Sequence, residues 1–510
     1  MGVALFGALA EVFTTNLFLY SWLGVLAGMT IGVLPGLSAT MGVAILTPLT
    51  FWLQPAQGLA VLLGVYNSAI WAGGVSAVLI NTPGTPASIA QTFDGYQMVK
   101  DGKIGLALNV NTIYSVIGGL MGTLALTVAA FPVARFALRF GPPEMFALAA
   151  FGLTMMISVS GKKIVNGLFA GALGLLVSTI GLDPMHAIPR FTFGNVNLLS
   201  GIPFVVALVG MFGVGEVLYQ ISERVVQKNG TGEEKLSSEL LARMGRLLPT
   251  REELKESSLA VSISSVISVI IGAIPGTGGD IASIVCWQQA KQMSKNPDEF
   301  GEGSYTGLAV TSAANNAVIG GAMTTMMTLG IPGDGVTAVL IGSLMMYGMQ
   351  PGPRLFIEQT DFVYSVMALM WVGYLMILAL GMLSARASSV ILRIKQEYIW
   401  IVIVGFCILG SFAINNSLFD VCVMFVAGIL GFVFKKADIP LGPFILALLL
   451  GPIAESNFRR SLALSQGDLS IFVTRSITVV LLLLSVVSLL WAPISEAMRR
   501  KKIDSSQADA

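Results

Sequence analysis

Long apolar runs, separated by short polar segments, cover most of the chain. The stretch from Val12 through Phe93 contains no Asp, Glu, Lys, Arg or His. A helix needs about 20 consecutive apolar residues to cross the hydrocarbon core of a bilayer. Strands of a membrane β-barrel alternate apolar and polar residues, and these runs do not. The pattern therefore predicts an all-α, polytopic integral membrane protein with about 11 to 12 transmembrane helices.

Composition agrees with a membrane protein and argues against several other classes. Hydrophobic residues make up 55% of the chain and charged residues only 11%, and there are 57 glycines, which let membrane helices pack closely. The net charge of +1 gives no electrostatic basis for nucleic-acid binding. The cysteines Cys286, Cys407 and Cys422 lie in apolar segments without metal-ligand spacing, so we interpret them as packing residues.

Two stretches about 240 residues apart are nearly the same. Pro-Gly interrupts an apolar run at 35–36 and again at 275–276. A second Pro-Gly follows in each copy, at 83–84 and at 332–333. Asn67 precedes Pro83 by sixteen residues, and Asn316 precedes Pro332 by sixteen. Paired helix breaks in two halves of a membrane protein are a pointer to a transporter's binding site.

The pattern divides the chain into four parts. Residues 1–220 form a first membrane repeat with a hairpin at 18–54, and 221–257 form a polar linker. Residues 258–495 form a second repeat with a hairpin at 258–290 and additional C-terminal helices, and 496–510 form a tail. We expect both hairpins to contain broken, re-entrant helices.

Orientation follows from Lys and Arg in short loops, which favour the cytoplasmic side. This rule places the linker and the tail in the cytoplasm. An odd number of apolar segments precedes the linker, so the second repeat starts on the opposite side of the membrane and the repeats are inverted. Four places disagree with the rule, at Arg135 and Arg139, Arg190, Arg354, and Arg459 and Arg460.

No constellation for catalysis is visible. The only histidine, His186, has no Cys or carboxylate cluster around it, and no Walker-type loop ends in Lys-Ser or Lys-Thr. We therefore expect no enzyme activity and no cofactor.

The helix breaks instead carry uncharged polar groups. A helix that starts after Pro-Gly presents free N–H groups and a positive dipole end, which suit a carboxylate. Unwound carbonyls nearby suit Na⁺. The other interpretation is that Pro and Gly merely kink helices and let them pack. The predicted substrate-binding residues are Gly36, Ser38, Thr40, Asn67, Thr82, Gly84, Thr85, Gly276, Thr277, Gly278, Asn315, Asn316 and Gly333.

Acids within the apolar segments are candidates for ion coupling, because a buried acid is costly unless it binds something. Asp280 lies in the second hairpin and Asp334 at the second break, and we predict that these two couple transport to an ion. Asp94 follows the first break and is interpreted as a cap of a turn. The sequence leaves Na⁺ and H⁺ open as the coupling ion, and we expect no metal site other than one for Na⁺.

Taken in order, the motifs resemble those of the TctA family, the large membrane subunit of tripartite tricarboxylate transporters. They are GVLPGLSAT at 32–40, NTPGTPAS at 81–88, FDGYQM at 93–98, GAIPGTGGD at 272–280 and GIPGD at 330–334. The resemblance implies a bacterial inner-membrane permease that imports citrate and other organic carboxylates with an ion gradient. It also implies two partners, a small four-helix membrane subunit (TctB-like) and a periplasmic substrate-binding protein (TctC-like).

Three other functions remain to be weighed. A stand-alone ion-coupled carboxylate symporter would need no binding protein. An integral membrane enzyme would need clustered His, Cys or acids. A scaffold subunit would not need matched helix breaks in two halves.

Overall fold

A computed structural model describes residues 2–34, 37–159, 164–183, 185–226, 245–384 and 396–490. Gly36, most of the predicted linker and the predicted tail at 496–510 lie outside these residues. Within them the fold is helical, apart from a two-stranded antiparallel ribbon of β1 (Gly181–Leu182) and β2 (Pro189–Arg190). This confirms the prediction of an all-α fold.

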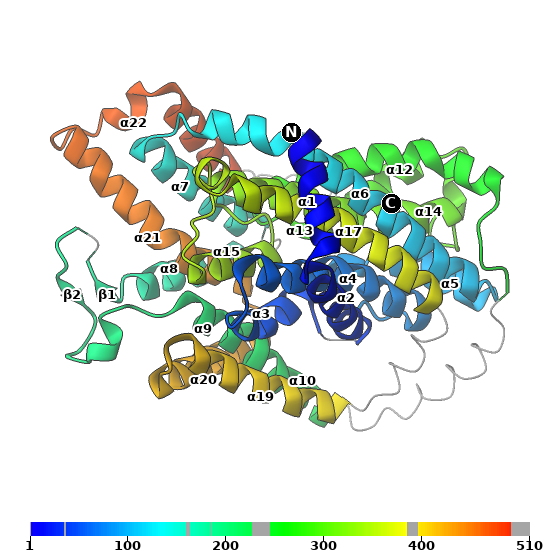
Figure 1. The fold of residues 1–510 in the computed structure, drawn as a ribbon, viewed down its shortest axis with the longest axis horizontal. Coiled ribbons are helices and arrows are strands. Elements are labelled where there is room, and N and C mark those ends of the chain that lie inside the picture. Colours follow the sequence, from blue (N-terminus) through cyan, green and yellow to red (C-terminus); the bar gives the residue numbers. More distant parts are fainter. Residues whose placement is uncertain are drawn as a thin grey trace, which may run out of the picture.

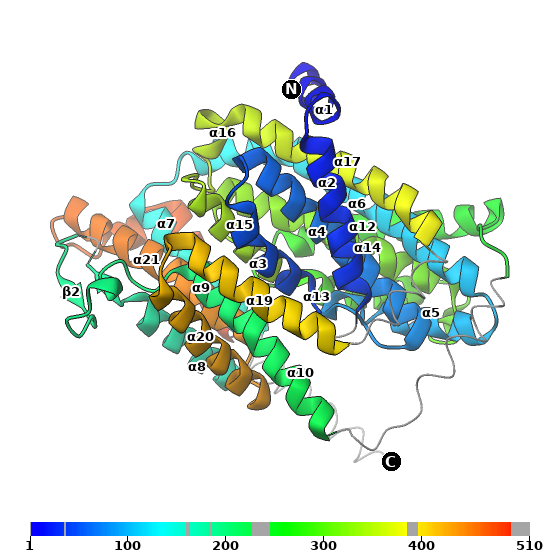
Figure 2. The ribbon, with the colours of Figure 1, turned by 60° about the horizontal axis from the view of Figure 1, so that its bottom comes forward.

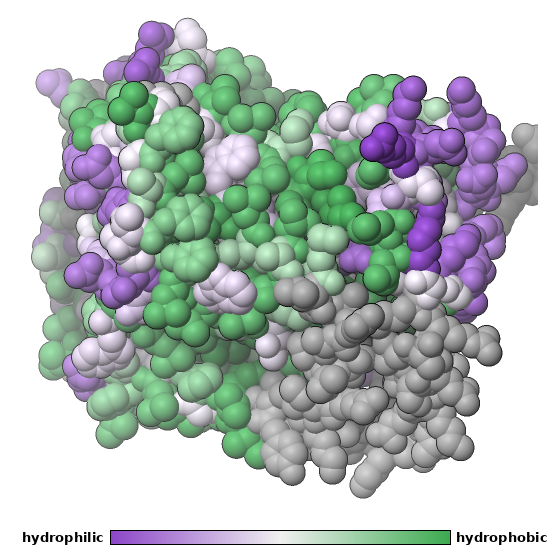
Figure 3. Space-filling model, turned by 45° about the vertical axis from the view of Figure 1, so that its right-hand side comes forward, coloured by the Kyte–Doolittle hydropathy of each residue, from purple (hydrophilic) through white to green (hydrophobic). Residues whose placement is uncertain are grey.

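Seven helices in the described residues are long and apolar enough to cross a membrane. They are α4 (Pro55–Ile80), α6 (Ile104–Ala137), the span Phe204–Glu223, α12 (Arg251–Gly272), α17 (Thr360–Ser384), α20 (Leu418–Lys436) and α21 (Leu441–Leu464). The span Phe204–Glu223 runs through α9 (Phe204–Leu208), the π-helix η4 (Val209–Val214) and into α10 (Gly215–Val226). One face of the molecule carries a broad hydrophobic belt between two hydrophilic rims (Figure 3). These features confirm a membrane protein with many spans.

Shorter helices complete the bundle. An eighth span forms if α1 (Gly2–Thr14) and α2 (Leu17–Val33), which are bent by 77° at their junction, are counted together. The remaining elements are α3 (Ala39–Thr50), η1 (Pro86–Ser88), α5 (Gln91–Lys100), α7 (Pro142–Val159), α8 (Ile164–Ser178), η3 (Val196–Leu198), α13 (Gly278–Met293), η5 (Pro297–Glu299), α14 (Tyr305–Leu329), α15 (Gly335–Met346), α16 (Leu355–Glu358), α19 (Gln396–Asn415) and α22 (Ile471–Thr474), with a further apolar helix at Ser476–Leu490.

Two groups of three helices repeat the same arrangement. In the first repeat α2 leads to α3 and then α4, and in the second α12 leads to α13 and then α14 (Figures 1 and 2). The third helix of each group ends on a residue in the left-handed conformation, Asn81 with φ 55° and Gly330 with φ 71°. Asn and Gly tolerate that conformation, and the Pro-Gly that follows two residues later prevents the helix from continuing.

Close helix contacts occur at equivalent positions in the two groups. A Cβ placed on Gly32 would lie 2.3 Å from the carbonyl oxygen of Ala69, and one placed on Gly272 would lie 2.2 Å from that of Val318. Only glycine allows backbones to approach this closely. The same contact therefore joins the first and third helix of each repeat, α2 to α4 and α12 to α14.

Helices at corresponding places in the two repeats run in opposite directions. Both α6 and α17 follow the second Pro-Gly of their repeat. The indole nitrogen of Trp371 donates to the Thr127 hydroxyl at 3.3 Å. Further along α17, a Cβ on Gly381 would meet the Thr112 side chain at 2.5 Å. Residue numbers rise on α17 as they fall on α6, as inverted repeats require.

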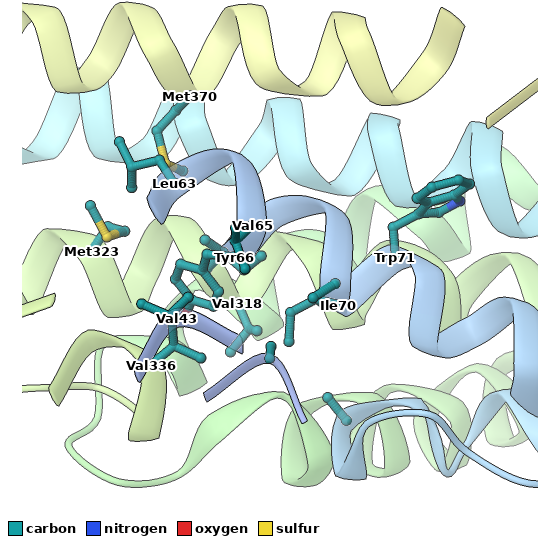
Figure 4. Packing of buried hydrophobic residues seen from close by; sticks show 14 of the residues in the cluster. Val43, Leu63, Val65, Tyr66, Ile70, Trp71, Val318, Met323, Val336 and Met370 are labelled. Carbon is teal, nitrogen blue, oxygen red and sulfur yellow. The ribbon is translucent and has the colours of Figure 1, made fainter. Parts of the chain in front are cut away.

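The centre of the molecule is formed by α4 and α14. Tyr66 and Trp71 of α4 are among the largest fully buried side chains. Around α4, the close-up shows Val318 of α14, Val336 of α15 and Met370 of α17 (Figure 4). Polar residues on α4 and α14 are therefore shielded from lipid by protein on several sides.

Candidate functional site

Helix starts from the two repeats meet in crosswise pairs. The start of α3 in the first repeat packs on the start of α15 in the second, where a Cβ on Gly335 would lie 3.0 Å from Oγ1 of Thr40. The start of α13 in the second repeat packs on η1 in the first, where a Cβ on Gly279 would lie 3.0 Å from Cβ of Ala87. In each repeat, the segment after the first Pro-Gly therefore packs on the segment after the second Pro-Gly of the other repeat.

Asp334 caps α15 and holds the first repeat at the same time. Its Oδ1 accepts the backbone N–H of Thr337 at 2.8 Å and the Thr337 hydroxyl at 2.7 Å. Its Oδ2 accepts the phenol of Tyr66 on α4 at 2.5 Å. Both carboxylate oxygens are therefore engaged within the protein, which gives Asp334 a structural role beyond the predicted ion coupling.

An equivalent set of contacts follows the second Pro-Gly of the first repeat, at 83–84. The hydroxyls of Thr85 and Ser88 are 2.9 Å apart, and the amide nitrogen of Asn315 donates to Ser88 Oγ at 3.4 Å. Thr85 and Ser88 stand 249 residues before Asp334 and Thr337, the same separation as between Pro83 and Pro332. Asn315 stands 249 residues after Tyr66. In each repeat, one residue of the central helix therefore bonds to the segment after the second Pro-Gly of the other repeat. Tyr66 on α4 does so in the first repeat, and Asn315 on α14 in the second.

The second hairpin is tied to the second break at its tip. The N–H of Gly276 donates to the carbonyl of Gly333 at 2.8 Å. The hydroxyl of Thr277 donates to the carbonyls of Ile271 and Ile274, at 2.5 and 2.9 Å. These bonds satisfy carbonyls at the end of α12 and close the turn between α12 and α13.

Asp280 and Asp334 flank the same glycine. A Cβ on Gly278 would lie 2.8 Å from Oδ1 of Asp280 and 3.9 Å from Cβ of Asp334. Gly278 has φ +64°, a conformation that favours glycine. The Asp280 side chain is half-buried in the first turn of α13. The structure thus brings the two predicted coupling acids together.

At the first hairpin, Ser38 caps α3. Its hydroxyl accepts the backbone N–H of Met41 at 3.2 Å. Thr40 is half-buried in the first turn of the same helix. Both residues lie where the sequence predicts them, beside a helix start, whereas Gly36 falls outside the described residues.

Gly84 and Gly333 fill equivalent tight spaces. A Cβ on Gly84 would lie 2.0 Å from the Gly32 carbonyl oxygen, and one on Gly333 would lie 2.5 Å from that of Gly272. The second break of each repeat therefore packs directly on the backbone of the first. At these two positions glycine is required for close approach.

The predicted residues Asn67, Asn316 and Thr82 have different surroundings. Asn67 is fully buried and faces α17, where a Cβ on Gly373 would lie 3.2 Å from its amide nitrogen. Among the described residues neither amide atom of Asn67 has a hydrogen-bond partner, and the same holds for Oδ1 of Asn316. Thr82 is exposed and its hydroxyl donates to the Ile80 carbonyl. Contacts within the described residues do not place these three side chains where α3 packs on α15 or where α13 packs on η1.

Asp94 joins the two repeats at another place. Its carboxylate accepts the indole N–H of Trp287 at 2.7 Å and the backbone N–H groups of Gly301 and Ser304, each at 2.8 Å. It thereby fastens α5 to the loop before α14. With these donors satisfying it, Asp94 serves as a structural acceptor.

Sequence analysis missed Tyr66 and Ser88, which bond to the other repeat, and Thr337, which bonds to Asp334 at the start of α15. Each is apolar in part or common in membrane helices, so composition gives no signal. The signal that finds them is the constant separation of 249 residues between the second parts of the repeats, which aligns Tyr66 with Asn315. Among the described residues there is no group of three or more His, Cys, Asp or Glu that suits a metal ion.

Comparison with known proteins agrees with this architecture. The tripartite tricarboxylate transporter TctA family matches residues 18–446, which include both hairpins and both breaks. The chain belongs to the TctA family. This is a family of transporter components, so the chain is a component of a tricarboxylate transporter.

Two similar proteins come from Agrobacterium vitis. One, described as an uncharacterized 52.8 kDa protein in the TAR-I ttuC' 3' region, is 35% identical over 463 residues, which cover 91% of this chain and 90% of that protein. Another, described as an uncharacterized protein in the TAR-II ttuC' 3' region, is 35% identical over 223 residues, covering 44% of this chain and 92% of that protein. No solved structure matches the chain.

Proposed function

We propose that this TctA-family chain is the permease subunit of a binding-protein-dependent secondary transporter. It imports organic tri- and dicarboxylates across the bacterial inner membrane, driven by a gradient of Na⁺ or H⁺. The observation that carries this proposal is the crosswise meeting of helix starts from two inverted repeats. Such broken helices at a repeat interface are where secondary transporters bind substrate and ion.

The first turn of α3 is the best place for a substrate carboxylate. It offers the positive end of a helix dipole and the hydroxyls of Ser38 and Thr40, and residues 38–50 contain no acid. No Lys or Arg occurs between Leu17 and Phe93. Binding by backbone N–H groups and hydroxyls avoids a permanently buried cation and leaves the site weak enough to release its substrate.

Partners follow from the family rather than from the contacts of this chain. A small four-helix membrane subunit and a periplasmic substrate-binding protein complete a tripartite system, and much of the choice of carboxylate rests with the binding protein. The alternative is a stand-alone symporter that needs no binding protein.

Uptake of labelled citrate into right-side-out membrane vesicles tests the proposal. Vesicles that contain this chain and its small membrane subunit should accumulate label only when the binding protein is added and an ion gradient is imposed. Vesicles without this chain are the control. Equal accumulation with and without the binding protein would favour the stand-alone symporter. Failure to accumulate any of a panel of di- and tricarboxylates with all components present would contradict the proposal.

A further inference from the structure

An apolar hollow lies beside the start of α3. It has a volume of about 430 Å³, and its wall is formed by residues of α2, α19, α3 and the turn before α3. α3 packs on both α2 and α19 (Figure 2). Leu37 and Met41 belong to the wall and stand on either side of Ser38 and Thr40 in the sequence. An occupant of the hollow would therefore touch the turn of α3 that carries these hydroxyls.

The wall of the hollow offers nothing that a polar ligand could bind. None of its described residues is charged, and among them only Thr30 has a polar side chain. The Thr30 hydroxyl donates its proton to the Leu26 carbonyl at 2.9 Å. A polar ligand would lose its hydration here without gaining hydrogen bonds, and an apolar cavity of this kind does not hold ordered water. The chemistry of the wall therefore selects an apolar occupant.

The hollow opens on a surface that faces the hydrocarbon of the bilayer. Thr30, Val402 and Phe406 line it and are themselves exposed. The stretches that carry them, 17–34 and 400–415, contain no Asp, Glu, Lys or Arg. Segments without charge over this length belong in the hydrocarbon core. The material around the opening is therefore the acyl chains of membrane lipids.

The volume of the hollow distinguishes a lipid chain from a helix of a partner subunit. One helical turn with its side chains is about 10 Å wide and about 5 Å tall, so it takes up roughly 400 Å³. The hollow therefore holds no more than a single turn of a partner helix. An extended hydrocarbon chain is only about 4 Å wide, the distance between carbon atoms in contact. Several of its methylene groups fit inside and make dispersion contacts with the wall on all sides.

We propose that the hollow between α2, α3 and α19 binds one acyl chain of a membrane phospholipid. The chain lies against Leu34, Met41 and Ile403, which belong to the wall and are only 4%, 1% and 6% exposed. Lipid that merely surrounds the protein does not reach side chains buried to this degree. The bound chain supports the first hairpin where α3 begins, whichever solute the protein carries.

Photo-crosslinking of the purified full chain in lipid nanodiscs tests the site. The probe is a phosphatidylethanolamine with a diazirine in the middle of one acyl chain, and mass spectrometry of peptides locates the adducts. We expect adducts at Leu34, Met41 and Ile403, besides those at lipid-facing residues such as Val426 on α20, which is 67% exposed. Ala27→Trp fills the hollow from α2. Because the indole takes the space of the chain, adducts at Met41 should fall roughly fivefold or more, while those at Val426 stay unchanged.

Leu409→Trp is the matched control, because it places an indole on α19 at a residue that is 61% exposed and outside the wall. Its adducts should equal those of the unaltered chain. Thermal unfolding shows whether each variant is folded, and Val402→Trp, which fills the hollow from α19, replaces Ala27→Trp if that variant is not.

Three results would overturn the proposal. The first is a set of adducts confined to exposed residues, and the second is undiminished labelling of Met41 in a folded variant with a filled hollow. The third is loss of the Met41 adduct when the small membrane subunit is added to the nanodiscs, because a segment of that subunit would then be the occupant. Since no substrate is present, failure of carboxylate uptake would leave the result standing.

Discussion

The phenol of Tyr66 donates a 2.5 Å hydrogen bond to Oδ2 of Asp334, and this bond joins the two repeats at the start of α15. Its counterpart is the contact of Asn315 with Ser88 at 3.4 Å. Each bond runs from the central helix of one repeat to the segment after the second break of the other. Any movement of one repeat against the other, as alternating access requires, has to change these two contacts.

Tyr66→Phe removes the phenol while keeping the ring that fills the core. A hydrogen bond to a charged group contributes about 1.5–3 kcal/mol, so we expect the variant to unfold more easily by that order. A double-mutant cycle with Asp334→Asn, followed by unfolding in detergent, measures the coupling. Effects that add within about 0.5 kcal/mol would mean that the two side chains do not interact.

Gly32→Ala and Gly272→Ala test the equivalent close contacts. The new Cβ would lie 2.3 Å from the Ala69 carbonyl oxygen or 2.2 Å from that of Val318, so helices must separate. We expect each change to destabilise by about 1–3 kcal/mol or more. Gly405→Ala on α19 is the control, because a Cβ there meets nothing within 4 Å, and it should be neutral or stabilising. A similar loss of folded protein in all three would refute the assigned packing.

Much of the fold was readable from the sequence, because apolar runs and Pro-Gly breaks report directly on membrane helices. The two hairpins and the inverted order came from spacing and from Lys and Arg in loops. The crosswise exchange could not be predicted, because it depends on which break each helix start contacts. Asn67 illustrates the limit. Its spacing matches Asn316, yet its neighbour Tyr66 is the residue that faces Asp334. A shift of one residue turns a helical side chain by about 100°, and spacing alone does not select the face.

The β1–β2 ribbon gives a prediction about pH. Backbone N–H groups of His186 and Met185, with help from Arg459, lower the pKa of Asp183 to about 2. A lowered folded-state pKa stabilises the ribbon above the usual pKa of an aspartate, about 3.9, and this contribution disappears as pH falls through 2. Hydrogen exchange of the backbone amide of His186 should therefore show a protection factor that is constant above about pH 4 and falls below it. Asp183→Asn should lower the protection at neutral pH, and an unchanged protection factor would contradict this role.

Topology can be tested at two exposed residues at opposite ends of the molecule. Phe193, 90% exposed, follows the β1–β2 ribbon, and Leu248, 54% exposed, precedes α12 (Figure 1). In a chain whose native cysteines are replaced by serine, Phe193→Cys should react with a membrane-impermeant maleimide in intact cells. Leu248→Cys should react only after lysis. Labelling of Leu248→Cys in intact cells would reverse the assigned orientation.

The most direct test of the central claim is an experimental structure of this chain with citrate bound, determined in NaCl. The account predicts that a citrate carboxylate lies within about 3.5 Å of backbone N–H groups in the first turn of α3 and of the hydroxyls of Ser38 or Thr40. Two results would contradict the account: citrate carboxylates paired with arginine or lysine, or citrate bound away from the starts of α3, α13 and α15.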